Sequence, residues 1–362
     1  MEYRTLGNTG TVVSTLCLGT MTFGAESDEK VAHEQLDRFV EQGGNFVDTA
    51  DVYSDGESET ITGRWLAARA GIRDQVVVAT KARFPRGDGR NEVGLSRVSL
   101  TRALDASLRR LGVDTIDLYQ AHAWDPLTPI EETLRFFDDA VRVGKVQYVG
   151  VSNFIGWQLQ KAALLARHLG LAPIITLQPQ YNLLQRGVEF ELTQVCVNEG
   201  IGILPWSPLG GGWLSGKYQR DNAPTGRTRL GEDPERGMEA YGRRNPEERT
   251  WRVIDAVRSV AEARGASMAQ VALAWLVDRP AVTSVILGAR TLEQLEDNLG
   301  AADLHLSAEE TALLDEASAP IVDDYPYGDL GVSQRDRALP APRPSRRTPR
   351  SLMSYSVEGG EA

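Results

Sequence analysis

The feature that most constrains the fold is a repeated alternation of short apolar runs with longer amphipathic stretches. The amphipathic stretch 130–146 shows the pattern, because Leu134, Phe137 and Val141 fall close to one helical face. Apolar strands separated by such helices indicate parallel βαβ units that are buried on both faces. The apolar runs lie at 16–20, 46–50, 76–81, 115–122, 148–153, 174–182, 202–208 and 284–289.

The number of apolar runs matches the eight strands of a closed (β/α)8 barrel. The alternative is a doubly wound sheet, which would carry a Gly-rich dinucleotide turn after its first strand. The segment GTMTFGAES at 19–27 does not have that G-x-G-x-x-G pattern. We therefore predict an α/β fold, a (β/α)8 TIM barrel over residues 1–330, with an N-terminal β-hairpin at residues 3–13 around Gly-Asn-Thr-Gly.

Two segments depart from a minimal barrel. Residues 210–248 follow the seventh predicted strand, are rich in Gly, Pro, Arg and Asp, and are too long for a plain connection. We expect this long loop to be a lid. Residues 331–362 form a C-terminal tail in which the stretch 333–350 has six Arg against one Asp. We expect this basic, Pro/Arg-rich tail to be disordered and solvated, with docking to a protein partner as the alternative.

Composition narrows the classes of partner. The net charge of −11 disfavours binding to nucleic acid phosphates and to anionic membranes. The N-terminus has no signal-peptide pattern, and no apolar run approaches the ~20 residues of a membrane span. Cys17 and Cys196 each lie inside an apparent strand or helix, so we expect two buried, reduced thiols and a cytoplasmic protein.

Polar residues finish several of the apolar runs, and in a parallel barrel such ends meet at the active site. Asp48, Lys81 and His122 stand at three of these ends, and Tyr53 follows Asp48 by five residues. A carboxylate at the end of a buried strand is costly without a partner. We therefore expect Lys81, at the end of the neighbouring strand, to pair with Asp48.

These four residue types suit carbonyl reduction. An ammonium beside the hydroxyl of Tyr53 lowers its pKa from ~10 and makes proton donation easier. Hydride arriving at a carbonyl carbon leaves negative charge on oxygen, which needs such a donor, and His122 could orient the same oxygen. Each residue also has a structural explanation as a turn cap, a solvated strand end, a ring in the barrel mouth or a core histidine. Their position at one rim favours the functional explanation.

Several motifs together resemble the aldo-keto reductase superfamily over about residues 3–325. They are GTMTFG, FVDTADVYSDGESE, LDASLRRLGVDTIDLYQAH, VGKVQYVGVSNF, QPQYNLL, PWSPLGGGWLSGKY and GARTLEQLEDN. The closest resemblance is to the branch with bacterial reductases and potassium-channel β-subunits. It implies Tyr53 as proton donor, Lys81 as modulator of its pKa, Asp48 as partner of Lys81 and His122 as substrate orienter.

The resemblance also implies that NADPH/NADP+ binds across the barrel mouth without a Rossmann domain. Ser152, Asn153 and Gln178 would bond the nicotinamide carboxamide, Trp206 would stack on the ring, and Arg290 would hold the 2′-phosphate. Asp297 stands where the family usually has Glu. The other cofactor-binding candidates are Gly19, Thr20, Met21, Asp48, Ser207, Pro208, Leu209, Gly210, Gly212, Lys217, Gly288, Ala289, Gln294 and Asn298.

The expected substrate is a small, partly apolar carbonyl compound, contacted by Met21, Phe23, Tyr53, Phe84 and Trp124. A second function, an NADPH-binding redox-sensing regulatory subunit with slow turnover, has the basic tail as its support. A glycosidase would need a second carboxylate at the strand ends. A metal hydrolase would need ligand spacing that the four histidines do not have, so no metal is expected. A monomer is the expected oligomeric state.

Overall fold

The computed structural model describes residues 1–226, 228–235 and 237–335. The chain divides into two compact units, Met1–Pro320 and Ile321–Ala362, and the short helix α13 (Asp329–Arg335) belongs to the second. The predicted boundary at residue 330 stays a prediction. The predicted disordered tail falls, from residue 336 onward, outside the described residues.

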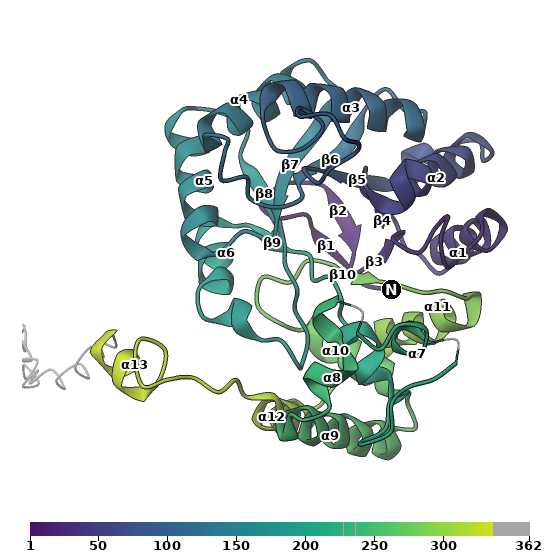
Figure 1. Ribbon diagram of the computed structural model, residues 1–362, viewed down its shortest axis with the longest axis vertical. Coiled ribbons are helices and arrows are strands. Elements are labelled where there is room, and N and C mark those ends of the chain that lie inside the picture. Colours follow the sequence, from purple (N-terminus) through teal and green to yellow (C-terminus); the bar gives the residue numbers. More distant parts are fainter. Residues whose placement is uncertain (227, 236, 336–362) are drawn as a thin grey trace, which may run out of the picture. The chain divides into compact units, whose positions relative to one another are not determined.

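An eight-stranded parallel sheet forms the centre of the first unit (Figure 1). A bridge between Ile203 and Val282 joins its two ends, where the amide of Thr283 donates to the Ile203 carbonyl at 2.9 Å. The amide of Ile286 also donates to the carbonyl of Pro205 at 3.0 Å. The predicted (β/α)8 barrel is therefore confirmed. In spatial order its strands are β10 (Val285–Leu287), β3 (Leu16–Gly19), β4 (Phe46–Asp48), β5 (Val77–Ala82), β6 (Ile116–Ala121), β7 (Val146–Ser152), β8 (Ile174–Gln178) and β9 (Gly202–Ile203).

The predicted hairpin is also present, as antiparallel strands β1 (Tyr3–Thr5) and β2 (Val12–Ser14). Leu6 and Val13 from this hairpin join one buried cluster with side chains from the barrel strands, including Cys17 and Phe46. Gly7 allows the close approach: its φ is +56°, and a Cβ there would lie 2.2 Å from the carbonyl oxygen of Ile175. The hairpin thus packs against the N-terminal part of β8.

Helices surround the strands, and a second, larger apolar cluster fills the layer between them. Local signals set their ends: the Asp28 side chain accepts from the amide of Val31 at 2.9 Å, and Gly112 ends α3 with φ +65°. The helices that surround the strands are α1 (Glu29–Glu41), α2 (Glu57–Ala67), α3 (Arg97–Leu111), α4 (Ile130–Arg142), α5 (Gly156–His168), α6 (Leu192–Glu199), α9 (Glu248–Arg264), α10 (Met268–Val277), α11 (Leu292–Leu299) and α12 (Ala308–Ser318). No helix in the described ranges is long and apolar enough to cross a bilayer.

The long segment expected to be a lid has its own short helices. It contains α7 (Arg229–Glu232) and α8 (Tyr241–Arg244), with 3-10 turns at Gly210–Ser215 and Gly237–Glu239. The Trp213 ring organises them, because it stacks on Tyr241 at 5.5 Å and its Nε1 donates to the Glu239 carbonyl at 2.9 Å. The segment is therefore more ordered than a plain loop, and its role as a lid stays a prediction.

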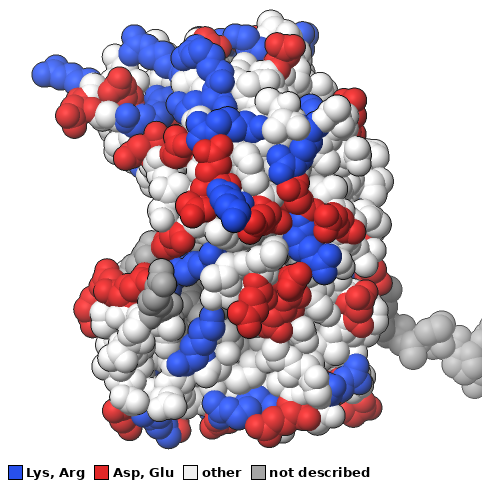
Figure 2. Space-filling model, turned by 90° about the vertical axis from the view of Figure 1, so that its right-hand side faces the viewer, with Lys and Arg blue, Asp and Glu red and all other residues white. Residues whose placement is uncertain are grey.

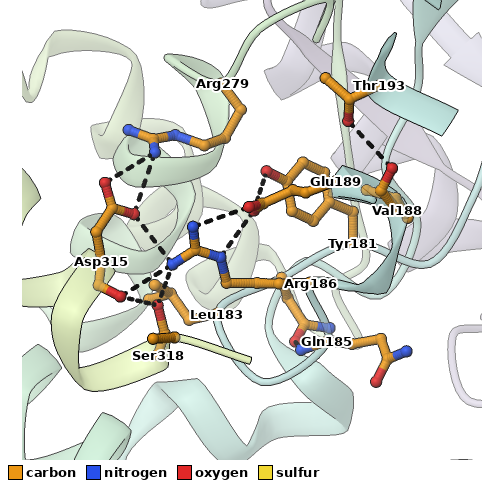
Figure 3. A network of polar contacts seen from close by, with 12 residues as sticks. Tyr181, Leu183, Gln185, Arg186, Val188, Glu189, Thr193, Arg279, Asp315 and Ser318 are labelled. Carbon is orange, nitrogen blue, oxygen red and sulfur yellow. Dashed lines mark hydrogen bonds and ion pairs between the residues drawn. The ribbon is translucent and has the colours of Figure 1, made fainter. Parts of the chain in front are cut away.

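A network of partly buried charges ties α12 to the loop after β8 (Figure 3). Arg186 donates to both carboxylate oxygens of Glu189, at 2.7 and 2.9 Å, and to the Ser318 hydroxyl at 2.8 Å. Arg279 donates to both oxygens of Asp315 at 3.2 Å. Each guanidinium therefore has a carboxylate partner, and the network fixes the last helix of the first unit.

Charges of both signs are interspersed on the face that carries α1, α2 and α11 (Figure 2). Ion pairs account for part of this pattern: Arg64 pairs with Glu29 at 2.7 Å and Arg38 with Glu296 at 3.0 Å.

Candidate active site

A buried ion pair lies at the carboxyl ends of β4 and β5. The Lys81 ammonium donates to Asp48 Oδ2 at 2.7 Å and to the Thr49 carbonyl at 2.6 Å. The side chains of Lys81 and Asp48 are 0% and 2% exposed, so both charges have left water. The predicted partnership of these two residues is confirmed, and it arises because β4 and β5 are adjacent parallel strands.

Two amides complete the environment of Asp48. Its Oδ1 accepts from the side-chain Nε2 of Gln178 at 2.9 Å and of Gln120 at 3.3 Å. With Lys81, this carboxylate has three hydrogen-bond donors. Sequence reasoning missed Gln120, although its place two residues before His122 puts it on the same face of β6. Gln178 was predicted to bind the nicotinamide carboxamide, but its side-chain nitrogen donates to Asp48 within the protein.

Tyr53 lies against this ion pair, with the Lys81 nitrogen 4.7 Å from its ring centroid. The turn that presents it is unusual, because Ser54, Asp55 and Gly56 follow one another with φ of 48°, 53° and 92°. Burial raises the pKa of the Tyr53 phenol, and the charge of Lys81 lowers it by less. The predicted net lowering is therefore wrong here: the ammonium acts as expected, but desolvation outweighs it.

The ammonium itself remains charged. Burial lowers the pKa of Lys81, but the charge of Asp48, the hydrogen bond between them and the neighbouring Tyr53 outweigh burial and raise it overall. Lys81 is therefore held as a cation beside the phenol at neutral pH.

His122 closes the group of four. Its ring lies edge-on to Phe84 at 4.7 Å and to Tyr53 at 5.9 Å. Burial, with the charges of Lys81 and Arg83, holds the pKa of His122 well below its usual value, so the ring is neutral. Its buried Nδ1 has no partner in the part of the chain that the structure describes. The structure thus brings all four predicted catalytic residues together and leaves a buried histidine nitrogen unused.

Asp51 is a second unexpected member of this region. It is 3% exposed, and neither of its carboxylate oxygens has a hydrogen-bond partner among the described residues. Burial and the charge of Glu59 raise the pKa of Asp51 to about 7, although Arg86 lies 3.7 Å away. In the sequence, the only indication that Asp51 belongs to the site is its position two residues before Tyr53.

Asn153 connects three of the predicted residues. Its Nδ2 donates to the His122 carbonyl at 2.9 Å, and its Oδ1 accepts from Trp206 Nε1 at 3.0 Å. Ser152 donates to the carbonyl of Gln178 at 2.7 Å. Both amide atoms of Asn153 are thus used in orienting its neighbours, and its predicted contact with a nicotinamide carboxamide stays a prediction.

A run of left-handed backbone follows β9. Ser207, Gly210, Gly211 and Gly212 have φ of 53°, 57°, 65° and 100°, and Asn182 donates to the Ser207 carbonyl at 2.8 Å. A Cβ on Gly212 would lie 3.1 Å from the Tyr218 hydroxyl, so glycine fits the conformation and the space. Successive amides in such turns form concave sites for anions. Two of the amides are already used in turns, since Gly210 donates to the Ser207 carbonyl at 3.0 Å and Gly212 to the Leu209 carbonyl at 3.0 Å. The predicted cofactor contact of this segment, which also includes Pro208, Leu209 and Lys217, therefore stays a prediction.

The segment after β10 contains the predicted adenosine-binding residues. Nothing lies within 4 Å of the position a Cβ would take on Gly288. The backbone is held by Thr22, which donates to the Ala289 carbonyl at 2.9 Å, and by Gln294, which accepts from the Arg290 amide at 3.0 Å. Asn298, also predicted, is buried in α11. The open space at Gly288 suits a ligand that runs along the backbone.

Two predicted residues of this end have protein partners. The Arg290 guanidinium pairs with Glu26 at 3.3 Å and with Glu232, in α7, at 3.0 Å. Asp297 accepts hydrogen bonds from Ser267 at 3.0 Å and Gln270 at 3.2 Å, both at the start of α10. A 2′-phosphate at Arg290 would therefore meet two carboxylates already in place.

The first predicted cofactor loop is mostly buried. Gly19 packs against β10, where a Cβ would lie 2.7 Å from Ile286 Cγ2, and Thr20 lies 2.7 Å from the Ser58 hydroxyl, with either oxygen able to donate. Met21 is 42% exposed and is the one of these three side chains that a ligand can reach. Phe23, predicted as a substrate contact, is fully buried in the core, and its contact with a substrate stays a prediction.

The aromatic residues at the mouth extend beyond those predicted. Trp124 lies edge-on to Phe154 at 5.2 Å and to Trp157 at 5.3 Å. Trp157 is 56% exposed and was missed, since a tryptophan near the start of a helix is usually core. Phe84 and Trp124, both partly exposed, keep their predicted place beside the site.

A separate open depression of about 650 Å³ lies around the start of β5 and β6. Arg73 crosses it and donates to the carbonyl of Thr115 at 2.9 Å and to Asp117 Oδ1 at 3.0 Å. Asp117 Oδ2 also accepts from the amide of Val78 at 2.7 Å. Because these charges have partners, the depression does not show the unused polar atoms that mark the other end of the barrel.

Comparison with known proteins agrees with this geometry. The sequence profile of the Aldo/keto reductase family matches residues 15–319, and the chain belongs to that family, a family of oxidoreductases. It is 39% identical over 324 residues to the uncharacterized oxidoreductase YrpG of Bacillus subtilis (strain 168), covering 87% of this chain and 95% of YrpG.

Two further relatives carry more specific names. A probable voltage-gated potassium channel subunit beta of Arabidopsis thaliana is 36% identical, with 84% of this chain and 92% of the relative covered. An NADP(+) aryl-alcohol dehydrogenase of Phanerodontia chrysosporium is 35% identical, with 88% and 86% covered. A bacterial oxidoreductase and a potassium channel subunit beta, the two kinds of protein that the resemblance places in one branch, are thus both among the relatives.

Proposed function

We propose that this protein reduces an aldehyde or ketone to the alcohol, with hydride from NADPH and a proton from Tyr53. The observation that carries the proposal is the Lys81 ammonium, fixed 2.7 Å from Asp48 and lying against the Tyr53 ring. A relative named as an NADP(+) aryl-alcohol dehydrogenase supports both the cofactor and the reaction.

When bound, NADPH supplies a hydride to the carbonyl carbon. Tyr53 donates its hydroxyl proton to the carbonyl oxygen, which becomes the alcohol, and the phenolate left behind is compensated by Lys81. The raised pKa of Tyr53 keeps the phenol protonated at neutral pH, ready to donate. Neutral His122 would hold the oxygen with a ring N–H, in a buried site where such a bond is strong.

The residues that would hold the cofactor lie in the segments with unusual backbone. Ser207 and Gly210–Gly212 would take the pyrophosphate, Trp206 would stack on the nicotinamide, and Arg290 would hold the 2′-phosphate. Ser152 and the side-chain amide of Gln178 would face the carboxamide. A cytoplasmic location is part of the same proposal, on the ground of two free, buried cysteines.

The test follows NADPH absorbance with a panel of aldehydes. Tyr53→Phe removes the proton and keeps the ring, so kcat should fall by ~10²–10⁴. The Kd for NADPH, measured by fluorescence, should stay close to the wild-type value. Turnover of Tyr53→Phe at the wild-type rate would show that the proton comes from elsewhere.

A second candidate is a nucleotide-sensing regulatory subunit, which the potassium channel subunit beta among the relatives favours. It would bind NADPH, turn over slowly and act on a partner through residues 331–362. Capture of a partner that depends on these residues, together with negligible reduction of every aldehyde tested, would support it. Steady turnover with an unaffected tail deletion would exclude it.

A further inference from the structure

One positive charge at the barrel mouth has no carboxylate partner. Arg83 directly follows β5 and stands two residues after Lys81. In the described ranges its guanidinium makes no hydrogen bond or ion pair, and its Nε is buried without a partner. A partly buried cation without an acceptor costs free energy, so its presence calls for an explanation.

The neighbours of Arg83 place it beside the proposed catalytic residues. Its Cζ lies 5.2 Å from the centroid of the Phe84 ring. The same Phe84 ring contacts His122, with the two ring centroids 4.7 Å apart. The charge of Arg83 reaches His122 and contributes to lowering its pKa. One aromatic ring therefore separates the guanidinium from the histidine that would orient the carbonyl oxygen.

Nearby charged groups do not satisfy Arg83. Asp125 is affected by its charge, but the Asp125 oxygens accept instead from the amides of Leu95 and Leu127, at 2.8 and 3.0 Å, and from Thr128 at 2.6 Å. Other arginines of the region do have acceptors. Arg86 donates to Ser99 at 3.0 Å and Arg110 to Glu59 at 2.7 Å.

A structural role for Arg83 would be the cation–π contact with Phe84, worth about 0.5–1 kcal/mol at an exposed site. That contact gives the guanidinium N–H groups no oxygen acceptor. Guanidinium N–H groups match the two oxygens of a carboxylate, and Arg is the residue best suited to that geometry.

We propose that Arg83 binds a negatively charged group of the substrate, and that the preferred substrates are carbonyl compounds that carry a carboxylate on an aromatic or other apolar body. Phe84, Trp124 and the exposed Trp157 would contact that body. This inference rests on the proposed reductase function and names the substrate class of the same site.

A pair of matched aldehydes tests the proposal: 4-carboxybenzaldehyde, which is anionic at neutral pH, and its neutral methyl ester. The wild-type protein should prefer the acid in kcat/KM by about tenfold or more, because truncating one partner of a charge pair at a binding site commonly costs at least this much. Arg83→Gln should remove the preference by raising KM for the acid, with the ester unaffected. Arg83→Lys should recover part of it, and Arg90→Gln, an exposed arginine of the same loop, should keep it.

An equal kcat/KM for acid and ester in the wild-type protein, or an unchanged preference in Arg83→Gln, would overturn the proposal. Calorimetry with 4-carboxybenzaldehyde separates this failure from failure of the reductase function. If no aldehyde is reduced, the anion should still bind the wild-type protein and should bind Arg83→Gln at least about tenfold more weakly. Equal binding to both would refute the role of Arg83 whatever the reaction is.

Discussion

Two clusters of charged residues, one partly exposed and one buried, differ in how completely their polar atoms are hydrogen-bonded. In the network of Figure 3, Arg186 and Arg279 have carboxylate partners, and the Tyr181 hydroxyl donates to Glu189 at 2.7 Å. Around Lys81 the ion pair is complete, but His122 and Asp51 keep buried polar atoms without hydrogen-bond partners among the described residues, although Arg86 lies 3.7 Å from Asp51. Charges with hydrogen-bonded partners hold elements of a fold together, whereas buried polar atoms without hydrogen bonds are found where a ligand binds or a proton is transferred.

The largest effect should come from breaking the ion pair itself. Lys81→Met leaves the Asp48 carboxylate buried without its cation, which costs about 3–5 kcal/mol of stability. The same change removes the charge that compensates the phenolate of Tyr53, so carbonyl reduction should fall by ~10²–10⁴. Chemical denaturation and NADPH-coupled turnover measure the two effects.

The double variant Asp48→Asn/Lys81→Met is the control. Both charges are then absent, so most of the lost stability should return while activity stays low. A double variant as unstable as Lys81→Met alone would mean that packing, and not the unpaired charge, causes the loss.

The buried Asp51, which has no hydrogen-bond partner among the described residues, should make the stability of the protein depend on pH. Its folded-state pKa, about 7, is raised from 3.8, so the folded protein holds the proton more tightly than the unfolded chain does. The stability contributed by Asp51 is therefore present at low pH and is lost as pH rises from about 4 to about 7. A shift of about three pKa units corresponds to at most about 4 kcal/mol.

Asp51→Asn cannot ionise, so the variant should be more stable than the wild type at pH 8 and nearly equal to it near pH 4. Thermal unfolding across this range measures the difference. A gain of the same size at both pH values would show that Asp51 does not titrate between them.

Breaking the network of Figure 3 should lower stability without lowering catalytic turnover. Arg186→Met leaves Glu189 without its bidentate partner and removes two contacts to α12, and we expect a loss of about 2–3 kcal/mol. Turnover per folded molecule should stay within about twofold of wild type, because the network contains none of the proposed catalytic groups. A selective fall in kcat at full folding would show that the network positions the active site.

The sequence predicts the barrel and the four-residue site well for a physical reason. Strand-end positions in a parallel barrel converge whatever the loops do, so Asp48 and Lys81 had to meet once β4 and β5 were neighbours. Gln120 lies on the same face as His122 and could have been found by the same rule of alternation.

Other features depend on quantities that residue order does not contain. The net pKa shift of Tyr53 is a balance between burial and one charge, and the complete burial of Phe23 depends on how a loop packs. The guanidinium of Arg83 likewise lacks hydrogen-bond partners in the described part of the chain, and only the three-dimensional arrangement of its neighbours shows this. Predictions from sequence therefore succeed for residues fixed by strands and fail for those fixed by solvent access.

The smallest effect concerns Arg290, which is satisfied like the peripheral arginines although it lies among the predicted cofactor residues. Its partner Glu232 is 45% exposed, so the ion pair is worth about 0.2–1 kcal/mol. Because this carboxylate would compete with a 2′-phosphate, Glu232→Gln should tighten NADPH binding by up to about fivefold and leave NADH unchanged. Fluorescence titration of both nucleotides, with Glu26→Gln in parallel, measures the difference. Equal weakening of NADPH and NADH would instead mean that the ion pair serves to hold the segment 210–248 in place, as the satisfied charges of Figure 3 hold α12.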